Sequence, residues 1–134
     1  MPLEKIASGG ELSRMMLALK SVLSDKDGVG TVVFDEVDAG ISGKTSRKVG
    51  IKLKQIAKET QVICVTHSAQ IASLSDTHFL IAKHEENGRT HTEVTTLDEE
   101  GSVREIARIL GGIHITESQL LAARDLIEDG KAYD

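Results

Sequence analysis

The sequence has few aromatic residues and a single cysteine. Tyr, Phe and Trp make up 2% of its 134 residues, and Trp is absent altogether. An aromatic platform on which nucleic-acid bases could stack is therefore not expected, and the core must be built from aliphatic side chains. Cys64 lies in the apolar run 62–65 and has no cysteine to pair with. The lack of a disulfide fits the reducing environment of the cytoplasm.

Long apolar stretches are missing as well. No run approaches the roughly 20 apolar residues needed to cross a membrane, and the first residues lack the apolar segment of a signal peptide. We therefore expect a cytoplasmic protein that has no membrane partner.

Basic residues are outnumbered but unevenly spread. The net charge is −5 at pH 7, with 16 Lys and Arg against 21 Asp and Glu, which argues against attraction of the whole surface to nucleic acid. Six of the 16 nevertheless gather in one predicted helix. They are Lys44, Arg47, Lys48, Lys52, Lys54 and Lys58. A solvated helix face is one interpretation, and contact with the DNA phosphate backbone is the other.

The length and hydrophobic content fit one compact domain, residues 1–134. No repeat, low-complexity tract or linker interrupts the chain. The apolar patterns of the first half predict a helix at 10–23, a buried strand at 31–34, a helix at 44–59 and a buried strand at 62–66. A strand, a helix of this length and another strand predict a right-handed crossover between parallel strands.

The second half is predicted to hold a short helix up to residue 74, a hairpin and a helical tail. Strands 77–82 and 90–96 flank Asn87-Gly88, which is typical of a hairpin turn. The tail contains two capping boxes, in which a Ser or Thr precedes a Glu or Gln by three residues. They are Ser102 with Glu105 and Thr116 with Gln119. We expect an α/β fold with a partly parallel sheet, flanking helices and a β-hairpin.

The first predicted helix is amphipathic. Ser8 and Glu11 form a capping box at its start, and six apolar residues follow at spacings of three and four, which predicts that they face the core. These residues are Leu12, Met15, Met16, Leu19, Val22 and Leu23.

Two glycines between Ser8 and Glu11 suggest more than a cap. A cap needs only the two outer residues, and each glycine costs about 1 kcal/mol at a helical position. A Ser hydroxyl and glycine amides at a helix N-terminus form a site for an anion such as phosphate. The segment Ser8-Gly9-Gly10-Glu11 is thus either an ordinary cap or a phosphate contact.

Three further polar residues follow the predicted strands. Asp35 and Glu36 come directly after the first strand and His67 after the second, so parallel strands would bring all three to the edge where α/β sheets bind ligands. In a nucleotide hydrolase, the first acid would hold Mg²⁺, the second would activate water, and the histidine would contact the transferring phosphate. The alternatives are a solvated loop and a structural histidine.

A phosphate-binding loop is absent from this sequence. Gly43-Lys44-Thr45 resembles the end of such a loop, but the glycine required five residues earlier is replaced by Asp38. A carboxylate would stand where phosphate oxygens belong, so we interpret this segment as a turn and helix start. The other four histidines show no spacing typical of metal ligands.

The ordered motifs together resemble the signature motif, Walker B motif and switch histidine of ABC-type ATPase heads. The surrounding residues resemble the C-terminal part of the RecN family of bacterial DNA repair proteins, which are relatives of SMC proteins. The segments that carry this resemblance are 4–14, 34–43, 65–68 and 104–112.

The resemblance implies that the chain is the C-terminal lobe of an ABC-type P-loop ATPase head. The N-terminal lobe of the same protein would supply the Walker A loop, and the chain alone is expected to be inactive. The implied cofactors are ATP and Mg²⁺. The implied setting is recombinational repair of DNA double-strand breaks by a nucleoid-associated cytoplasmic protein that binds DNA.

The same resemblance implies a role for each motif. Asp35 would bind Mg²⁺, and Glu36 and His67 would act as general base and γ-phosphate sensor in their own head. Two heads of a homodimer would sandwich ATP, so the signature residues would act on the nucleotide of the partner head. These residues are Ser8, Gly9, Gly10 and Glu11.

The chain departs from the general ABC pattern at two positions. Glu11 replaces a Gln, and Ser42 replaces the Asp that closes the D-loop after Walker B. We therefore place the D-loop on Asp38, Ala39 and Gly40. A different class of function remains open, namely a DNA-binding or dimerisation module that keeps this fold without hydrolysing ATP.

Overall fold

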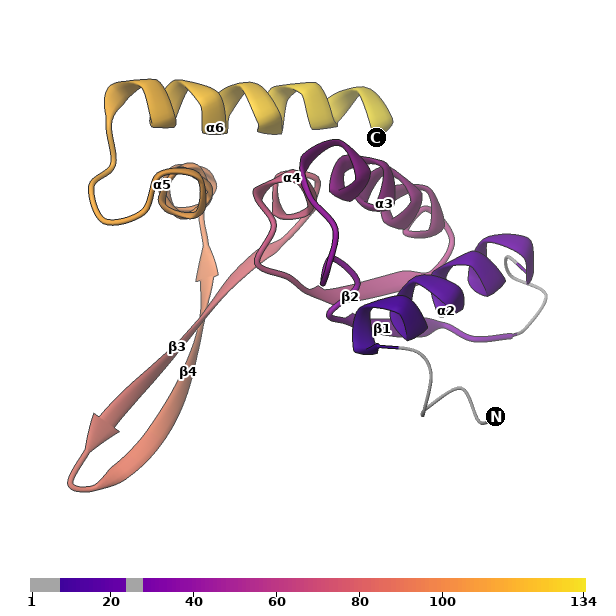
Figure 1. The fold of residues 1–134 in the computed structure, drawn as a ribbon, viewed down its shortest axis with the longest axis horizontal. Helices are drawn as coiled ribbons and strands as arrows, with labels where there is room; N and C mark the ends of the chain where they lie inside the picture. The colour runs from indigo at the N-terminus through magenta and orange to yellow at the C-terminus, as the bar shows by residue number, and fades with distance from the viewer. Residues whose placement is uncertain (1–7, 24–27) are drawn as a thin grey trace.

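The computed structural model describes residues 8–23 and 28–134. It is a mixed α/β fold with a parallel pair of strands, an antiparallel hairpin and helices around them (Figure 1). The elements are α2 (Gly9–Leu23), β1 (Thr31–Asp35), α3 (Gly43–Ile56), β2 (Gln61–Val65), α4 (Ala69–Ala72), β3 (His78–Glu86), β4 (Arg89–Leu97), α5 (Glu99–Gly111), α6 (Glu117–Gly130) and the 3₁₀ helix η2 (Lys131–Tyr133). This order confirms the predicted fold class.

The parallel pair forms as predicted. β1 and β2 pair in register from Thr31 with Gln61 to Asp35 with Val65, and α3 makes the connection. Their carboxyl ends therefore lie at the same edge.

The prediction of two buried strands holds for only one face of the described pair. Alternate side chains point into the core, but Val33, Ile63 and Val65 are 63%, 46% and 41% exposed. One face of the parallel pair is therefore apolar and open.

One core lies between this pair of strands and the helices. Phe34 from β1 packs with Leu17 of α2, Leu53 of α3 and Ile71 of α4, together with Val37 from the loop after β1. Both α2 and α3 thus cover the same face of the strands.

The buried face of α2 differs from the prediction. Gly10, Leu17 and Lys20 are buried, whereas the six residues of the apolar stripe are 40% to 80% exposed. The helix is amphipathic, but its apolar stripe points away from the core of the described residues.

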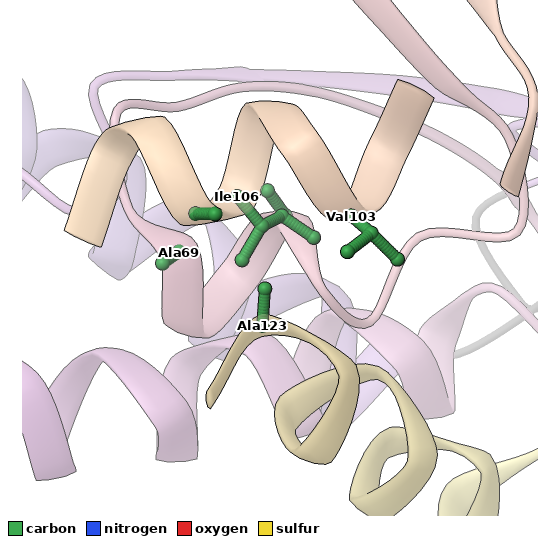
Figure 2. Packing of buried hydrophobic residues seen from close by; sticks show 6 residues of the cluster. Ala69, Val103, Ile106 and Ala123 are labelled. Atoms are coloured by element: carbon green, nitrogen blue, oxygen red, sulfur yellow. The ribbon is translucent and has the colours of Figure 1, made fainter. Parts of the chain in front are cut away.

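A second core joins α4 to the two C-terminal helices. Ala69 of α4 packs with Val103 and Ile106 of α5 and with Ala123 of α6 (Figure 2). Since Ile71 belongs to the first core, the four-residue α4 connects the two. The alanines keep these helices close together.

The hairpin projects away from both cores (Figure 1). β3 and β4 pair from His78 with Leu97 to Glu86 with Arg89. At the turn, Asn87 and Gly88 have φ values of +53° and +75°, as expected for an Asn-Gly hairpin turn. The predicted hairpin is confirmed, with longer strands than expected.

The caps of the last helices match the sequence in part. Thr116 and Gln119 form the predicted capping box, but α5 begins earlier than Ser102. Its N-cap is Asp98, whose carboxylate accepts a hydrogen bond from the backbone N–H of Gly101 at 2.7 Å.

Among the helices described here, none has the length and apolar character required to span a membrane.

Candidate functional site

The sequence-predicted site residues lie around the carboxyl edge of the parallel strands. Asp35 ends β1, Glu36 follows it, and His67 comes two residues after β2. All three residues are exposed. Within the described ranges their side chains form no hydrogen bond or ion pair. They are therefore accessible to a ligand at this edge.

Asp38 ties together the loops that follow β1 and β2. Its Oδ2 accepts a hydrogen bond from the Thr66 hydroxyl at 2.7 Å and another from the backbone N–H of His67 at 3.1 Å. Thr66 Oγ1 in turn accepts a hydrogen bond from the backbone N–H of Ser68 at 3.0 Å. One carboxylate thus fixes the backbone of the loop that carries His67.

Helix α2 holds the loop after β1 from the other side. The hydroxyl of Ser13 donates to the carbonyl oxygen of Asp35. Arg14 Nη1 donates to the carbonyl oxygens of Val37 and Ala39, at 3.1 and 2.7 Å. The loop with the acid pair is therefore bound to the first turns of α2.

The two glycines of α2 allow this close approach. A methyl group at Gly9 would collide with the carboxylate of Glu36, and one at Gly10 would lie 2.7 Å from the carbonyl oxygen of Ala39. Contact with a loop of the same chain thus explains a glycine pair that the sequence suggested was needed for phosphate. Ser8 acts as a cap, since its Oγ accepts a hydrogen bond from the backbone N–H of Glu11 at 3.1 Å.

Glu36 has an unusual backbone conformation. Its φ is +60°, in the left-handed region that residues other than glycine rarely adopt, at a cost of about 1 to 3 kcal/mol. This conformation, together with Gly40 at φ +77°, turns the chain sharply after β1. The turn places the Glu36 carboxylate against the start of α2.

A divalent cation at this edge would need ligands from elsewhere. No group of three or more His, Cys, Asp or Glu in the described part of the chain is arranged to hold a metal. Asp35 can contribute one carboxylate, which fits Mg²⁺, because this ion usually takes one or two carboxylates and completes its shell with water and substrate phosphates. Asp35 could therefore supply one ligand to Mg²⁺, and the remaining ligands would come from outside the described residues.

Cys64 packs against the core and is a poor candidate for ligand chemistry. Burial raises the pKa of its thiol to about 12, and the negative charges of Asp38 and Asp35 add to this effect. Because only the thiolate is a nucleophile or metal ligand, Cys64 stays neutral and serves as part of the packing below the strand ends.

Two residues of the basic helix α3 are not part of a solvated face. Arg47 donates to the carbonyl oxygens of Gln70 and Leu126, at 3.0 and 3.1 Å, and to Ser73 Oγ at 2.8 Å. It thereby links α3 to α4 and α6.

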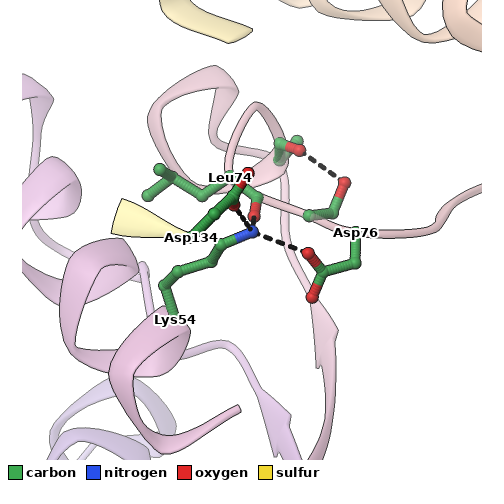
Figure 3. Close-up of polar contacts among 6 residues, drawn as sticks. Lys54, Leu74, Asp76 and Asp134 are labelled. Carbon is green, nitrogen blue, oxygen red and sulfur yellow. Dashed lines mark hydrogen bonds and ion pairs between the residues drawn. The ribbon is translucent and has the colours of Figure 1, made fainter. Parts of the chain in front are cut away.

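Lys54 is also held by internal contacts (Figure 3). It lies 2.7 Å from carboxylate oxygens of both Asp76 and Asp134, and donates to the carbonyl oxygen of Leu74 at 3.1 Å. Burial lowers the pKa of Lys54, but its hydrogen bonds to Asp134 and Asp76 outweigh this effect, so the pKa is raised overall.

Sequence reasoning missed Ser13, Arg14 and Thr66 as residues that hold the site together. Ser13 and Arg14 follow the signature motif directly, and Thr66 precedes His67. Each is a polar residue next to a recognised motif, which is the signal that could have identified it.

Gly43-Lys44-Thr45 opens α3, in agreement with its interpretation as a helix start.

The fold is similar to part of a solved SMC ATPase structure. A solved structure described as "Structural biochemistry of ATP-driven dimerization and DNA stimulated activation of SMC ATPases" superimposes with a TM-score of 0.57. It shares 22% sequence identity, and the match covers 82% of this chain and 66% of that one. No protein-family model matches the chain.

Sequence comparison gives the particular family. DNA repair protein RecN of Halalkalibacterium halodurans is 46% identical over 95% of this chain, that of Bacillus subtilis 42% over 94%, and that of Vibrio cholerae 45% over 94%. The chain belongs to the RecN family and corresponds to its C-terminal part. It spans 22% to 23% of the length of these relatives.

Proposed function

We propose that residues 1–134 form the C-terminal lobe of a RecN ATPase head that acts in repair of DNA double-strand breaks. The observation that carries the proposal is the meeting of the acid pair and His67 at one strand edge, with α2 bound to the same loop. The RecN relatives and the SMC-type fold support it.

The N-terminal lobe of the same protein would complete the head. This chain contains no phosphate loop, so the cradle for the ATP phosphates would come from that lobe. Parallel strands are normally covered on both faces, yet the face with Val33, Ile63 and Val65 is open. The open apolar face is where we place the N-terminal lobe.

Three residues would act on the nucleotide bound in their own head. Asp35 would hold Mg²⁺, which when bound neutralises charge on the phosphates. Glu36 would orient the attacking water and accept its proton. His67 would donate a hydrogen bond to the γ-phosphate, where negative charge develops in the transition state.

The signature segment would act on the ATP of a second head in a homodimer. Ser8 and the amides at the N-terminus of α2 form the kind of site that binds an anion, and Glu11 would support the turn. A methyl group at Gly9 would meet Glu36 and one at Gly10 would meet Ala39, so the start of α2 lies directly against the loop after β1. Binding of an anion at the start of α2 would therefore affect this loop. We assign the D-loop, residues 38–40, to the same interface.

The test is Glu36→Gln in an intact RecN protein that contains this segment. Glutamine keeps the size of the side chain but cannot accept the proton, so we expect ATP turnover to fall by about 100-fold or more while ATP-bound dimers persist. Glu86→Gln at the exposed hairpin tip is the matched control and should retain full turnover. Unchanged turnover in the Glu36→Gln protein would overturn the catalytic assignment, whereas absence of turnover in the wild-type protein would favour a non-catalytic DNA-binding or dimerisation module.

A further inference from the structure

Helix α3 is strongly basic in an acidic chain. Its sequence holds five basic residues and no acidic residue, while the whole chain has a net charge of −5. All of the net negative charge therefore lies outside this helix. Such a concentration of one sign on one element creates a local positive field.

The structure divides these five residues into two groups. Arg47 and Lys54 are used in internal contacts. The other three are exposed and, within residues 8–23 and 28–134, form no ion pair or hydrogen bond. These three residues, which we name the lysine row, are Lys44, Lys48 and Lys52.

The lysine row lies on the side of α3 that faces away from the core. Ser46, Gly50 and Leu53 are the buried residues of the helix. Lys48 is two residues from both Ser46 and Gly50, and at 100° per residue it projects from the opposite side. Successive lysines of the row are four residues apart, which is about 6 Å along the helix axis.

We propose that the lysine row contacts the phosphate backbone of double-stranded DNA. This inference rests on the proposed repair function and assigns a DNA-binding surface to it. The positive charge of the row is complementary to the negative phosphates. Its exposed neighbours Thr45 and Gln55 are polar, so the surface lacks the apolar centre of a protein interface. Phosphate contacts fix the position of a protein on DNA but carry no sequence information, so we expect binding through the row to be independent of DNA sequence.

Salt dependence provides a quantitative test. Each phosphate contact contributes about −0.9 to the slope of log affinity against log salt concentration. Replacing all three lysines by Gln in the intact protein should make the slope shallower by about 3. Affinity should also fall, whereas Lys→Arg at the same three positions should preserve both quantities.

The measurement is fluorescence anisotropy with a labelled duplex of mixed sequence over a series of salt concentrations. It is carried out without ATP, so that it does not depend on turnover. The control replaces three exposed basic residues elsewhere, Lys83, Arg89 and Arg104, by Gln. We expect the slope to change in the lysine-row variant and not in the control.

The outcomes separate this inference from the proposed function. If the wild-type protein binds the duplex and the lysine-row variant has the same slope and affinity, the row is not the DNA surface, although the ATPase assignment stands. An equal loss in both triple variants would show a general charge effect and would also overturn the inference. Failure of the wild-type protein to bind DNA would count against both proposals, and the Glu36→Gln test would then decide the ATPase assignment separately.

Discussion

Asp38 accepts a hydrogen bond from the backbone N–H of His67 at 3.1 Å, across 29 positions of sequence. The same oxygen accepts the Thr66 hydroxyl at 2.7 Å. A carboxylate that accepts two hydrogen bonds holds its donors more firmly than a neutral acceptor would. Asp38 therefore holds the backbone of His67 at the strand edge where the acid pair lies.

Asp38→Ala should weaken catalysis more than nucleotide binding. Loss of both hydrogen bonds would free the loop that carries His67, so we expect kcat to fall by about 10-fold or more with a smaller change in KM. Steady-state kinetics of an intact RecN protein provide the measurement. Asp38→Asn retains an oxygen acceptor and should recover part of the lost activity. Equal kcat and KM values for the wild type and Asp38→Ala would show that Asp38 does not position the loop that carries His67.

Substitution of the two glycines should have different consequences. At Gly9 an added methyl group meets the flexible end of the Glu36 side chain, but at Gly10 it meets the backbone of Ala39. Gly9→Ala should therefore reduce ATP turnover with little change in stability. Gly10→Ala should lower the free energy of unfolding by about 1 to 3 kcal/mol. Thermal unfolding and ATP turnover are measured for both variants. A large loss of stability in Gly9→Ala with none in Gly10→Ala would contradict the assignment of these contacts.

Arg47 should contribute more to stability than its neighbour Lys48. Arg47→Met removes the three hydrogen bonds that connect α3 with α4 and α6 and places an apolar side chain beside their acceptors. We expect a loss of about 2 to 3 kcal/mol in the free energy of unfolding, measured with denaturant. Lys48→Met on the exposed side should change stability by less than about 0.5 kcal/mol. Similar values for both would mean that Arg47 is not a link between the helices.

His78 should make the fold sensitive to mild acid. Burial lowers its pKa below 6.5, and the charge of Glu105 opposes this only in part. The unfolded chain therefore takes up a proton more readily, and the free energy of unfolding should fall as the pH drops below about 6.5 towards the lower pKa of the folded state. The His78→Gln protein should lose this part of the pH dependence, whereas exposed His114→Gln should keep it. Denaturant unfolding between pH 5 and pH 8 provides the measurement.

The order of the elements could be predicted because each has a clear local pattern. Apolar runs marked β1 and β2, and Asn87-Gly88 marked the hairpin turn. The exact start of a helix is harder to predict, because two neighbouring residues can both be suitable N-caps and the sequence pattern does not decide between them. Asp98 and Ser102 are both good N-caps, and the earlier one begins α5.

The buried face of α2 could not be predicted in the same way. An apolar stripe shows that a helix has a partner but not where that partner lies. Here Leu17 and Lys20 face the core, while Met16 and Leu19 are more than half exposed. The relatives are more than four times longer than the chain, and their remaining residues are the candidates for covering this stripe.

The candidate site was partly visible in the sequence. Parallel strands require that Asp35 and His67 share an edge, and they do. The bonds from Arg14 to the loop after β1, and from Thr66 to Asp38, join residues 23 to 28 positions apart. Such contacts depend on packing and leave no periodic signal.

The most direct test of the account is to reconstitute the head from two separate pieces. The 134-residue chain is mixed with a RecN N-terminal segment that contains the phosphate loop, and ATP turnover is measured with DNA present. We predict no turnover by either piece alone, turnover by the mixture, and none when the chain carries Glu36→Gln. Turnover by the chain alone, or by the mixture regardless of Glu36, would contradict the assignment of this chain as the catalytic lobe that completes the head.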